Sequence, residues 1–261
     1  MSVTGLTENA QPSSPRPWAG AVPALKATDL HVGYGSTLVL SGVDFHGGAG
    51  EAVGIVGPNG AGKTTLFSAL AGSIRPFSGS VELLGHDVTR TNVAERCRHG
   101  LGRAFQIPKP FLGMTVLENV IVGAAYGAGL RRRERYAKSV EVLEICGLTD
   151  MANRRAGALG LLSRKRLELA RALATEPAVL LLDEIGGGLT DAEADELVTT
   201  ILRLRESGIS MVWIEHVVHV LVRVIDRLVA MDAGQIIADG DPAAVLKDAA
   251  VVDAYLGRGE A

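Results

Sequence analysis

The sequence predicts an α/β fold built around a parallel sheet. Strand-like and helix-like segments alternate along the chain, a glycine-rich loop joins a buried strand to a helix, and two carboxylates follow a later buried strand. The 261 residues fit one large domain with inserts, for which we expect one sizeable core.

The first part of the chain is predicted to be mainly strands. Apolar residues alternate or run together in strand-like segments at residues 25–34, 43–45, 52–56 and 81–84. Residues 63–71 have helical spacing instead, with Leu66, Phe67 and Leu70 on one side. Gly72 follows at the position where a left-handed residue commonly ends a helix.

The middle of the chain is predicted to be a helical insert. Between residues 107 and 173 the apolar spacing changes from two to 3.6, which indicates helices near residues 116–126, 131–146 and 163–175. Thr115 and Glu118 have the spacing of a capping box at the start of the first of these helices.

The last part of the chain returns to alternating strands and helices. Strands are predicted at residues 178–183 and 209–215, and the helix between them begins with a second capping box, formed by Thr190 and Glu193. A hairpin around residues 232–235, a helix starting at Asp241 and a last helix at residues 251–256 complete the pattern. We expect residues 1–23 to be a disordered tail, residues 24–257 a single domain, and residues 258–261 a short tail.

Composition argues against several classes of protein. The formal net charge of −3 and an aromatic content of 4% disfavour a nucleic-acid-binding surface. Cys97 and Cys146 form no CxxC pair, which argues against a disulfide framework or a zinc site. The longest apolar runs, such as residues 178–182, are far shorter than the roughly 20 residues of a membrane-spanning helix. We therefore expect that the chain does not cross a bilayer.

One basic run stands out within the predicted insert. It consists of Arg131, Arg132, Arg133 and Arg135. Three interpretations stay open for it: an ordinary solvated face, a contact with lipid headgroups, or a contact with a partner protein.

A phosphate-binding loop is predicted at residues 57–64. Their sequence, Gly-Pro-Asn-Gly-Ala-Gly-Lys-Thr, matches GxxxxGK[ST] and lies between a buried strand and a helix. Glycines there let the backbone wrap around phosphate oxygens, and the helix N-terminus adds partial positive charge. We expect Lys63 to reach the β- and γ-phosphates of a nucleotide and the Thr64 hydroxyl to bind Mg²⁺.

Two carboxylates follow the buried strand at residues 179–182. Asp183 and Glu184 are expected at the carboxyl edge of the sheet, where open α/β sheets bind ligands. Asp183 suits a contact with Mg²⁺ through water. Because side chains alternate along a strand, Glu184 is expected to point differently and to hold the attacking water.

From about residue 25 to residue 257, these landmarks resemble the ATP-binding-cassette family. The resemblance implies a P-loop NTPase with a RecA-like core, an N-terminal antiparallel β subdomain and an inserted α-helical subdomain. It also implies that Tyr34 stacks on adenine, that Gln106 contacts Mg²⁺ and the water, and that His216 hydrogen-bonds the γ-phosphate.

The residues expected to act in the site fall into three sets. The nucleotide-binding set is Tyr34, Gly57, Pro58, Asn59, Gly60, Ala61, Gly62, Lys63, Thr64 and Thr65. The metal-binding set is Thr64, Gln106 and Asp183, and the catalytic set is Glu184, His216, Gln106 and Lys63.

The sequence departs from the family where the LSGGQ signature is usual. Gly160 replaces the serine, Leu161 and Leu162 replace the glycines, and Ser163 replaces the glutamine. In the family this segment faces the nucleotide of a second subunit, so we expect two leucine side chains to obstruct that approach. Ser163 could still cap the helix and offer its hydroxyl.

Two further departures follow the second carboxylate. Ile185 stands where proline is usual, and Thr190 stands where a loop near the dimer interface usually ends in aspartate. These changes also concern the partner's site, so the chain's own nucleotide site is expected to be intact.

Within the family, the chain is similar to the ATPases of branched-chain amino acid importers. The similarity lies in residues 105–106, 114–120 and 240–257 and in the run after Arg166. It implies an ATPase that uses ATP and Mg²⁺ at the cytoplasmic face of the inner (plasma) membrane. The implied partners are a second ATPase subunit, in a hetero- or homodimer, integral membrane permease subunits and, indirectly, a solute-binding protein, without nucleic acid.

Rival functions remain open. One is a soluble cassette ATPase that has no role in transport, and another is a catalytically weak cassette paired with a second, different ATPase. A subunit that binds ATP without hydrolysing it is disfavoured because Glu184 is present. A GTPase is disfavoured because the chain has no NKxD sequence.

Overall fold

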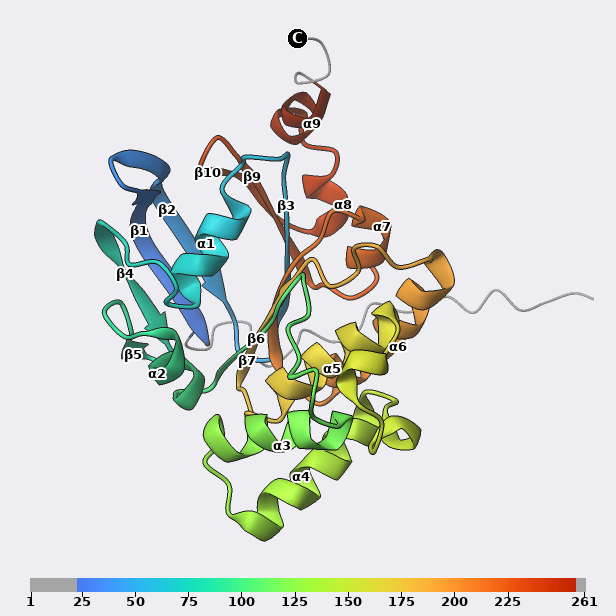
Figure 1. Cartoon of the computed structure of the whole chain (residues 1–261). Coiled ribbons are helices and arrows are strands. Elements are labelled where there is room, and N and C mark those ends of the chain that lie inside the picture. The colour runs from blue at the N-terminus through green and yellow to red at the C-terminus, as the bar shows by residue number, and fades with distance from the viewer. Residues whose placement is uncertain (1–22, 257–261) are drawn as a thin grey trace, which may run out of the picture.

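The computed structural model describes residues 23–256, which form two sheets and a group of helices (Figure 1). The tails predicted at residues 1–23 and 258–261 lie outside this range, apart from residue 23. The strands are β1 (Leu25–Tyr34), β2 (Thr37–Gly47), β3 (Ala52–Val56), β4 (Ser78–Leu83), β5 (His86–Asp87), β6 (Leu101–Ala104), β7 (Val179–Asp183), β8 (Ser210–Ile214), β9 (Arg227–Asp232) and β10 (Gln235–Gly240).

The predicted helices are present in the predicted order, and the structure adds two short ones, α2 (Val93–Arg98) and α7 (Val218–Leu221), that were not predicted from the sequence. The predicted ones are α1 (Lys63–Leu70), α3 (Val116–Tyr126), α4 (Arg132–Ile145), α5 (Leu161–Leu173), α6 (Asp191–Glu206), α8 (Pro242–Val245) and α9 (Ala249–Leu256), and 3-10 turns lie at Thr149–Met151 and Ala156–Ala158. The sheet orders are β10-β9-β3-β8-β7-β6 and β2-β1-β4-β5. The α/β fold class is confirmed, including the N-terminal antiparallel sheet and the helical part.

The larger sheet is parallel from β9 to β6 and separates two apolar clusters. On β7, Leu180 and Leu182 pack with the insert and α6, whereas Val179 and Leu181 pack with α1 and the antiparallel sheet. Figure 1 shows these two layers on opposite sides of the sheet. The expectation of one core is therefore wrong, because a parallel sheet buries both of its faces.

The helical insert begins as predicted. The Thr115 hydroxyl accepts a hydrogen bond from the Glu118 amide at 3.1 Å, and the Glu118 carboxylate accepts one from the Thr115 amide at 2.7 Å. In contrast, α5 begins at Leu161, with Gly160 as an N-cap residue that has no side chain to contribute. Leucine favours helix far more than glycine does, so the segment that replaces the usual glycines forms the first turn. The expectation that Ser163 caps this helix is wrong, because Ser163 lies inside it.

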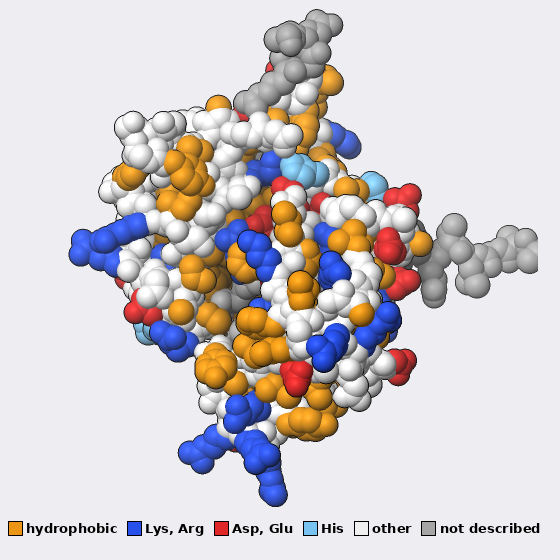
Figure 2. All heavy atoms as spheres, in the orientation of Figure 1, with side chains coloured by type: hydrophobic (Ala, Val, Ile, Leu, Met, Phe, Trp, Pro, Cys, Tyr) orange, Lys and Arg blue, Asp and Glu red, His pale blue; other side chains and the backbone are white. Residues whose placement is uncertain are grey.

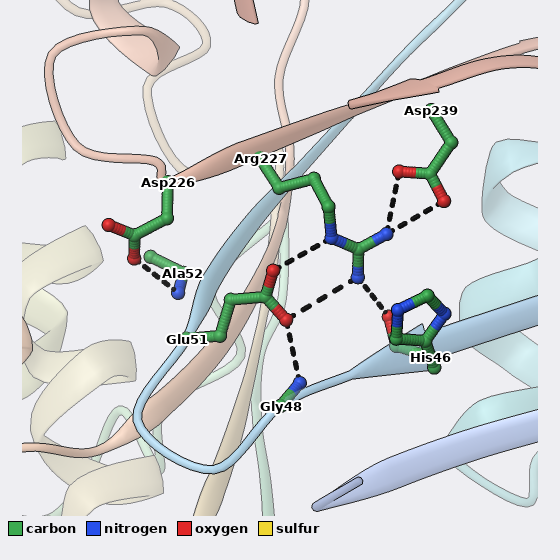
Figure 3. A network of polar contacts seen from close by, with 7 residues as sticks. All are labelled: His46, Gly48, Glu51, Ala52, Asp226, Arg227 and Asp239. Atoms are coloured by element: carbon green, nitrogen blue, oxygen red, sulfur yellow. Dashed lines mark hydrogen bonds and ion pairs between the residues drawn. The ribbon is translucent and has the colours of Figure 1, made fainter. Parts of the chain in front are cut away.

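A buried ion-pair network fixes the end of β3 that lies away from the predicted phosphate loop (Figure 3). The Glu51 carboxylate, 2% exposed, accepts hydrogen bonds from the Gly48 amide and from Arg227 Nε, both at 2.7 Å. Arg227 also donates to both oxygens of Asp239, at 2.6 and 2.7 Å. The start of β3 is thereby tied to β9, to β10 and to the segment after β2.

Candidate functional site

The loop between β3 and α1 has the backbone that a phosphate cradle needs. Gly62 has φ +100, a conformation that side chains disfavour, and a Cβ there would lie 2.6 Å from Leu40 Cδ2. A Cβ at Gly57 would lie 2.2 Å from the carbonyl oxygen of Met231. Glycine is therefore required at both ends of the loop, which packs against β2 and β9.

Lys63 points back into this loop. Its ammonium donates hydrogen bonds to the carbonyl oxygens of Gly57, at 2.6 Å, and Pro58, at 3.0 Å, and the residue is only 5% exposed. Burial lowers the pKa of Lys63, and the charge of Glu184 opposes that shift. An ammonium has three donors, so one remains for an anion, which would also offset the lost hydration.

A cavity of about 170 Å³ lies in front of the loop. Its lining combines the loop and the first turn of α1 with one residue of β2 and with two residues that follow β7 and β8. The lining residues are Val39, Asn59, Gly60, Ala61, Gly62, Lys63, Thr64, Thr65, Glu184 and His216. The structure thus brings together Lys63, Thr64, Glu184 and His216, as the sequence predicted. Among the expected residues, Tyr34, Gly57, Pro58, Gln106 and Asp183 do not line this cavity.

The Glu184 carboxylate is held between two side chains. Its Oε1 lies 2.8 Å from His216 Nε2, and its Oε2 accepts a hydrogen bond from Gln106 Nε2. The direction of Glu184 does not come from alternation along a strand, because β7 ends at Asp183 and Glu184 has φ +46. That part of the prediction is wrong: a left-handed turn of the backbone aims the side chain. A fixed carboxylate beside an imidazole can hold and orient a water molecule.

Asp183 has an ion-pair partner that sequence reasoning missed. Arg103 Nη2 lies 2.5 Å from Asp183 Oδ2, and Asp183 is 7% exposed. The available signal was an arginine inside the apolar strand β6, because a charged residue at such a position is rare unless it is paired.

The residues present fit Mg²⁺ only together with nucleotide phosphates. Within residues 23–256, no group of three or more His, Cys, Asp or Glu side chains could hold a metal ion by itself. The Thr64 hydroxyl and the Asp183 carboxylate are oxygen ligands of the kind that Mg²⁺ prefers, and phosphate oxygens would supply the others. The arrangement therefore suits a metal that arrives with its nucleotide.

Tyr34 and Gln106 are not among the residues that line the cavity. Tyr34, 54% exposed, ends β1 and leaves its ring accessible, while Gln106 contacts Glu184. Stacking of Tyr34 on adenine and metal contact by Gln106 stay predictions.

Two buried residues that were given no role support the site. Glu215, 2% exposed, accepts hydrogen bonds from the amides of Gly186 at 3.0 Å and His216 at 3.1 Å. It therefore joins the loop after Glu184 to the histidine. Lys165 of α5 is 3% exposed. Burial lowers the pKa of Lys165, and the charges of Glu215 and Glu184 oppose that shift.

The altered signature segment presents one exposed leucine rather than two. Leu161 is 45% exposed and lies beside Gly188, since a Cβ built on that glycine would be 3.4 Å from Leu161 Cδ2. Leu162 instead packs against the cluster that fills the insert. The expected obstruction by two side chains is thus reduced to Leu161.

The two departures after Glu184 have local structural roles. Ile185 is 2% exposed and belongs to the apolar cluster of the insert. Thr190 caps α6, because its hydroxyl accepts a hydrogen bond from the Glu193 amide and the Glu193 carboxylate accepts one from the Thr190 amide at 2.9 Å.

Comparison with known families and proteins matches nearly the whole described chain. A family described as ABC transporter matches residues 40–186, and one described as branched-chain amino acid ATP-binding cassette transporter matches residues 235–261. The high-affinity branched-chain amino acid transport ATP-binding protein BraF of Pseudomonas aeruginosa is 35% identical over 250 residues, which cover 90% of this chain and 98% of the relative. The probable branched-chain amino acid transport ATP-binding protein LivG of Methanocaldococcus jannaschii is 33% identical, with coverage of 86% and 93%.

Solved structures show the same fold. A nucleotide-free ATP-binding cassette from an ABC transporter superposes with a TM-score of 0.82 at 31% identity, covering 90% of this chain and 100% of the other. The ADP conformation of the cassette MJ1267 gives a TM-score of 0.81 at 31% identity, with coverage of 90% and 99%. Within residues 23–256, no helix is both long enough and apolar enough to span a membrane.

Proposed function

Because the chain belongs to the ATP-binding cassette family of transporter ATPases, we propose that it powers the import of a small solute, with branched-chain or other hydrophobic amino acids as the solute class. Several relatives that match over most of the chain are ATP-binding proteins of branched-chain amino acid transport. They do not favour the rival of a cassette ATPase outside transport. The observation that carries the hydrolytic part is the Glu184 carboxylate, held by Gln106 and His216 at the cavity that Lys63 lines.

The proposed reaction is in-line attack of water on the γ-phosphoryl group of ATP, which breaks the bond from the γ-phosphorus to the bridging oxygen and releases ADP and inorganic phosphate. Mg²⁺, when bound with the nucleotide, would neutralise charge on the phosphates. Glu184 accepts a hydrogen bond from the attacking water, and His216 keeps the carboxylate in place. Lys63 and the loop amides stabilise charge on the phosphate oxygens, so positioning and electrostatics supply most of the rate.

We propose that the chain works as one half of an ATPase dimer. Its own loop would face a partner's signature, and its own altered signature would face the partner's nucleotide. The Leu161 side chain offers no hydrogen-bond donor to a phosphate, so a second, different ATPase subunit would accommodate the alteration better than a second copy.

The segment between β6 and α3 supports a contact with a membrane permease. It exposes apolar side chains that a monomer has no reason to leave in water: Phe105, Ile107, Phe111, Leu112 and Met114. Figure 2 shows hydrophobic side chains among basic ones over the lower part of this face, where the insert lies. Three arginines of the basic run at the start of α4 line a hollow with Ile121 and Tyr136.

Isolation of the chain from the membranes of its native cell tests the proposal. We expect permease subunits, a second ATPase and a solute-binding protein to accompany it, and we expect uptake of labelled leucine to fail when its gene is deleted. A fully active ATPase that stays in the soluble fraction, with leucine uptake intact after deletion, would contradict the role in transport.

A further inference from the structure

Arg103 lies where three parts of the nucleotide site meet. Its Nη2 is 2.5 Å from Asp183 Oδ2 at the end of β7. Its guanidinium carbon lies 4.7 Å from the ring centre of Phe105 and 6.0 Å from that of Phe67. Phe105 precedes Gln106, and Phe67 is one helical turn after Lys63 and Thr64. One cation therefore contacts the carboxylate strand, the phosphate-loop helix and the segment that carries the glutamine.

The ion pair is poorly hydrated, and Arg103 is incompletely bonded. The side chains of Arg103 and Asp183 are 11% and 9% exposed. Arg103 Nε is buried and has no hydrogen-bond partner in the part of the chain that the structure describes. A buried carboxylate needs a counter-ion, and without nucleotide Arg103 is the basic side chain that supplies it to Asp183. Aromatic rings, rather than further hydrogen bonds, hold the guanidinium in place.

Resting on the proposed function, we propose that Arg103 is an internal counter-ion that competes with Mg²⁺ for the Asp183 carboxylate. Arg103 pairs with Oδ2 of the carboxylate that the metal site requires. Loading the metal, even through a water on the other oxygen, therefore places a divalent cation beside a guanidinium and weakens the ion pair. The side chains of Arg103 and Asp183 are about nine-tenths buried, so water and salt only weakly screen the repulsion between the guanidinium and a divalent cation bound at this carboxylate. Any gain from holding the short Asp183 side chain in one orientation is small by comparison, because few rotatable bonds are fixed.

A Mg²⁺ titration separates this role from a purely structural ion pair. The probe is a fluorescent, non-hydrolysable ATP analogue bound to the full chain, and the quantity measured is the Mg²⁺ concentration that gives half-maximal binding. Arg103→Met should lower that concentration about tenfold, which corresponds to about 1.4 kcal/mol. In EDTA, where no Mg²⁺ binds, the variant should not bind the analogue more tightly than the wild type, because the Arg103 charge opposes binding of the metal. Arg103→Lys, which keeps the charge, should stay close to the wild type.

The chain offers a matched control outside the site. Arg171 pairs with Glu168 at 3.0 Å and lies over the Phe111 ring at 5.1 Å, so it repeats the carboxylate-arginine-aromatic arrangement. Arg171→Met should leave the Mg²⁺ half-point unchanged. If Arg103→Met does not fold, Arg103→Gln replaces it, and a melting curve verifies each variant.

Two results would overturn the proposal. A higher half-point in Arg103→Met would show that Arg103 orients Asp183 for the metal, and an unchanged one would show a structural ion pair only. Both differ from failure of the proposed function, in which the wild type itself would bind no analogue at any Mg²⁺ concentration.

Discussion

The phosphate loop and the altered signature segment lie on the same chain but differ in chemistry: the first is polar and charged, and the second is mainly apolar. The loop has glycine backbone, a buried ammonium at Lys63 and the fixed carboxylate of Glu184. In the signature segment, the N-cap residue of α5 is Gly160, which gives the helix no side-chain cap, and the exposed Leu161 follows it. The first can stabilise a phosphate, whereas the second offers mainly apolar surface. The chain can therefore bind its own nucleotide but makes poor contacts with the nucleotide of its partner. We expect the two sites of the dimer to hydrolyse ATP at unequal rates.

The largest effect is expected from Glu184→Gln, which tests the intact side. The amide keeps the size of the side chain but cannot accept a proton from water, so hydrolysis should fall by about 10²- to 10⁴-fold, the range of a general base. ATP binding should persist and trap an ATP-bound dimer. Phosphate release and nucleotide binding measure the two properties, with the exposed Glu141→Gln as control. Undiminished turnover would remove Glu184 from the role of holding the water.

Rebuilding the signature tests the altered side and has a smaller expected effect. Gly160→Ser, Leu161→Gly, Leu162→Gly and Ser163→Gln together should raise hydrolysis at the partner's site by about tenfold, as one charge-assisted hydrogen bond to phosphate would. Leu161→Gly alone should give part of the gain. Leu162→Gly alone should only destabilise the fold, since Leu162 packs against the insert. If rebuilding left the hydrolysis rate of each site unchanged, the departures would be neutral.

The smallest expected effect is a pH dependence of ATP binding at the phosphate loop, caused by Lys63. Burial lowers the pKa of Lys63 from 10.5, against the charge of Glu184. Between the lowered and the ordinary pKa the unfolded chain binds more protons, so this residue's contribution to stability rises with pH across that window. A bound phosphate favours the charged ammonium, so ATP binding at alkaline pH should take up protons and weaken as pH rises. Calorimetry in buffers of different ionisation heat measures the sign, and proton release would contradict it.

Local patterns predicted the fold well where backbone chemistry alone decides the outcome. The capping boxes at Thr115 and Thr190, the loop before Lys63 and the left-handed Gly72 all formed as expected. Three features depended on tertiary contacts that spacing does not encode. Glu184 has a left-handed backbone, and its amide donates a hydrogen bond to the distant Ile214 carbonyl oxygen at 2.9 Å. The inward packing of Leu162 and the pairing of Arg103 with Asp183 likewise join residues that are distant in sequence.

The central claim is that a magnesium nucleotide occupies the cavity in front of Lys63, and calorimetric titration of MgATP into the folded chain tests it most directly. The predicted result is saturable binding of one nucleotide per chain, weakened about 100-fold or more in Lys63→Ala, since charge-assisted contacts to phosphate are among the strongest polar interactions. Absence of binding heat in well-folded wild-type protein, or equal affinity in Lys63→Ala, would contradict the account.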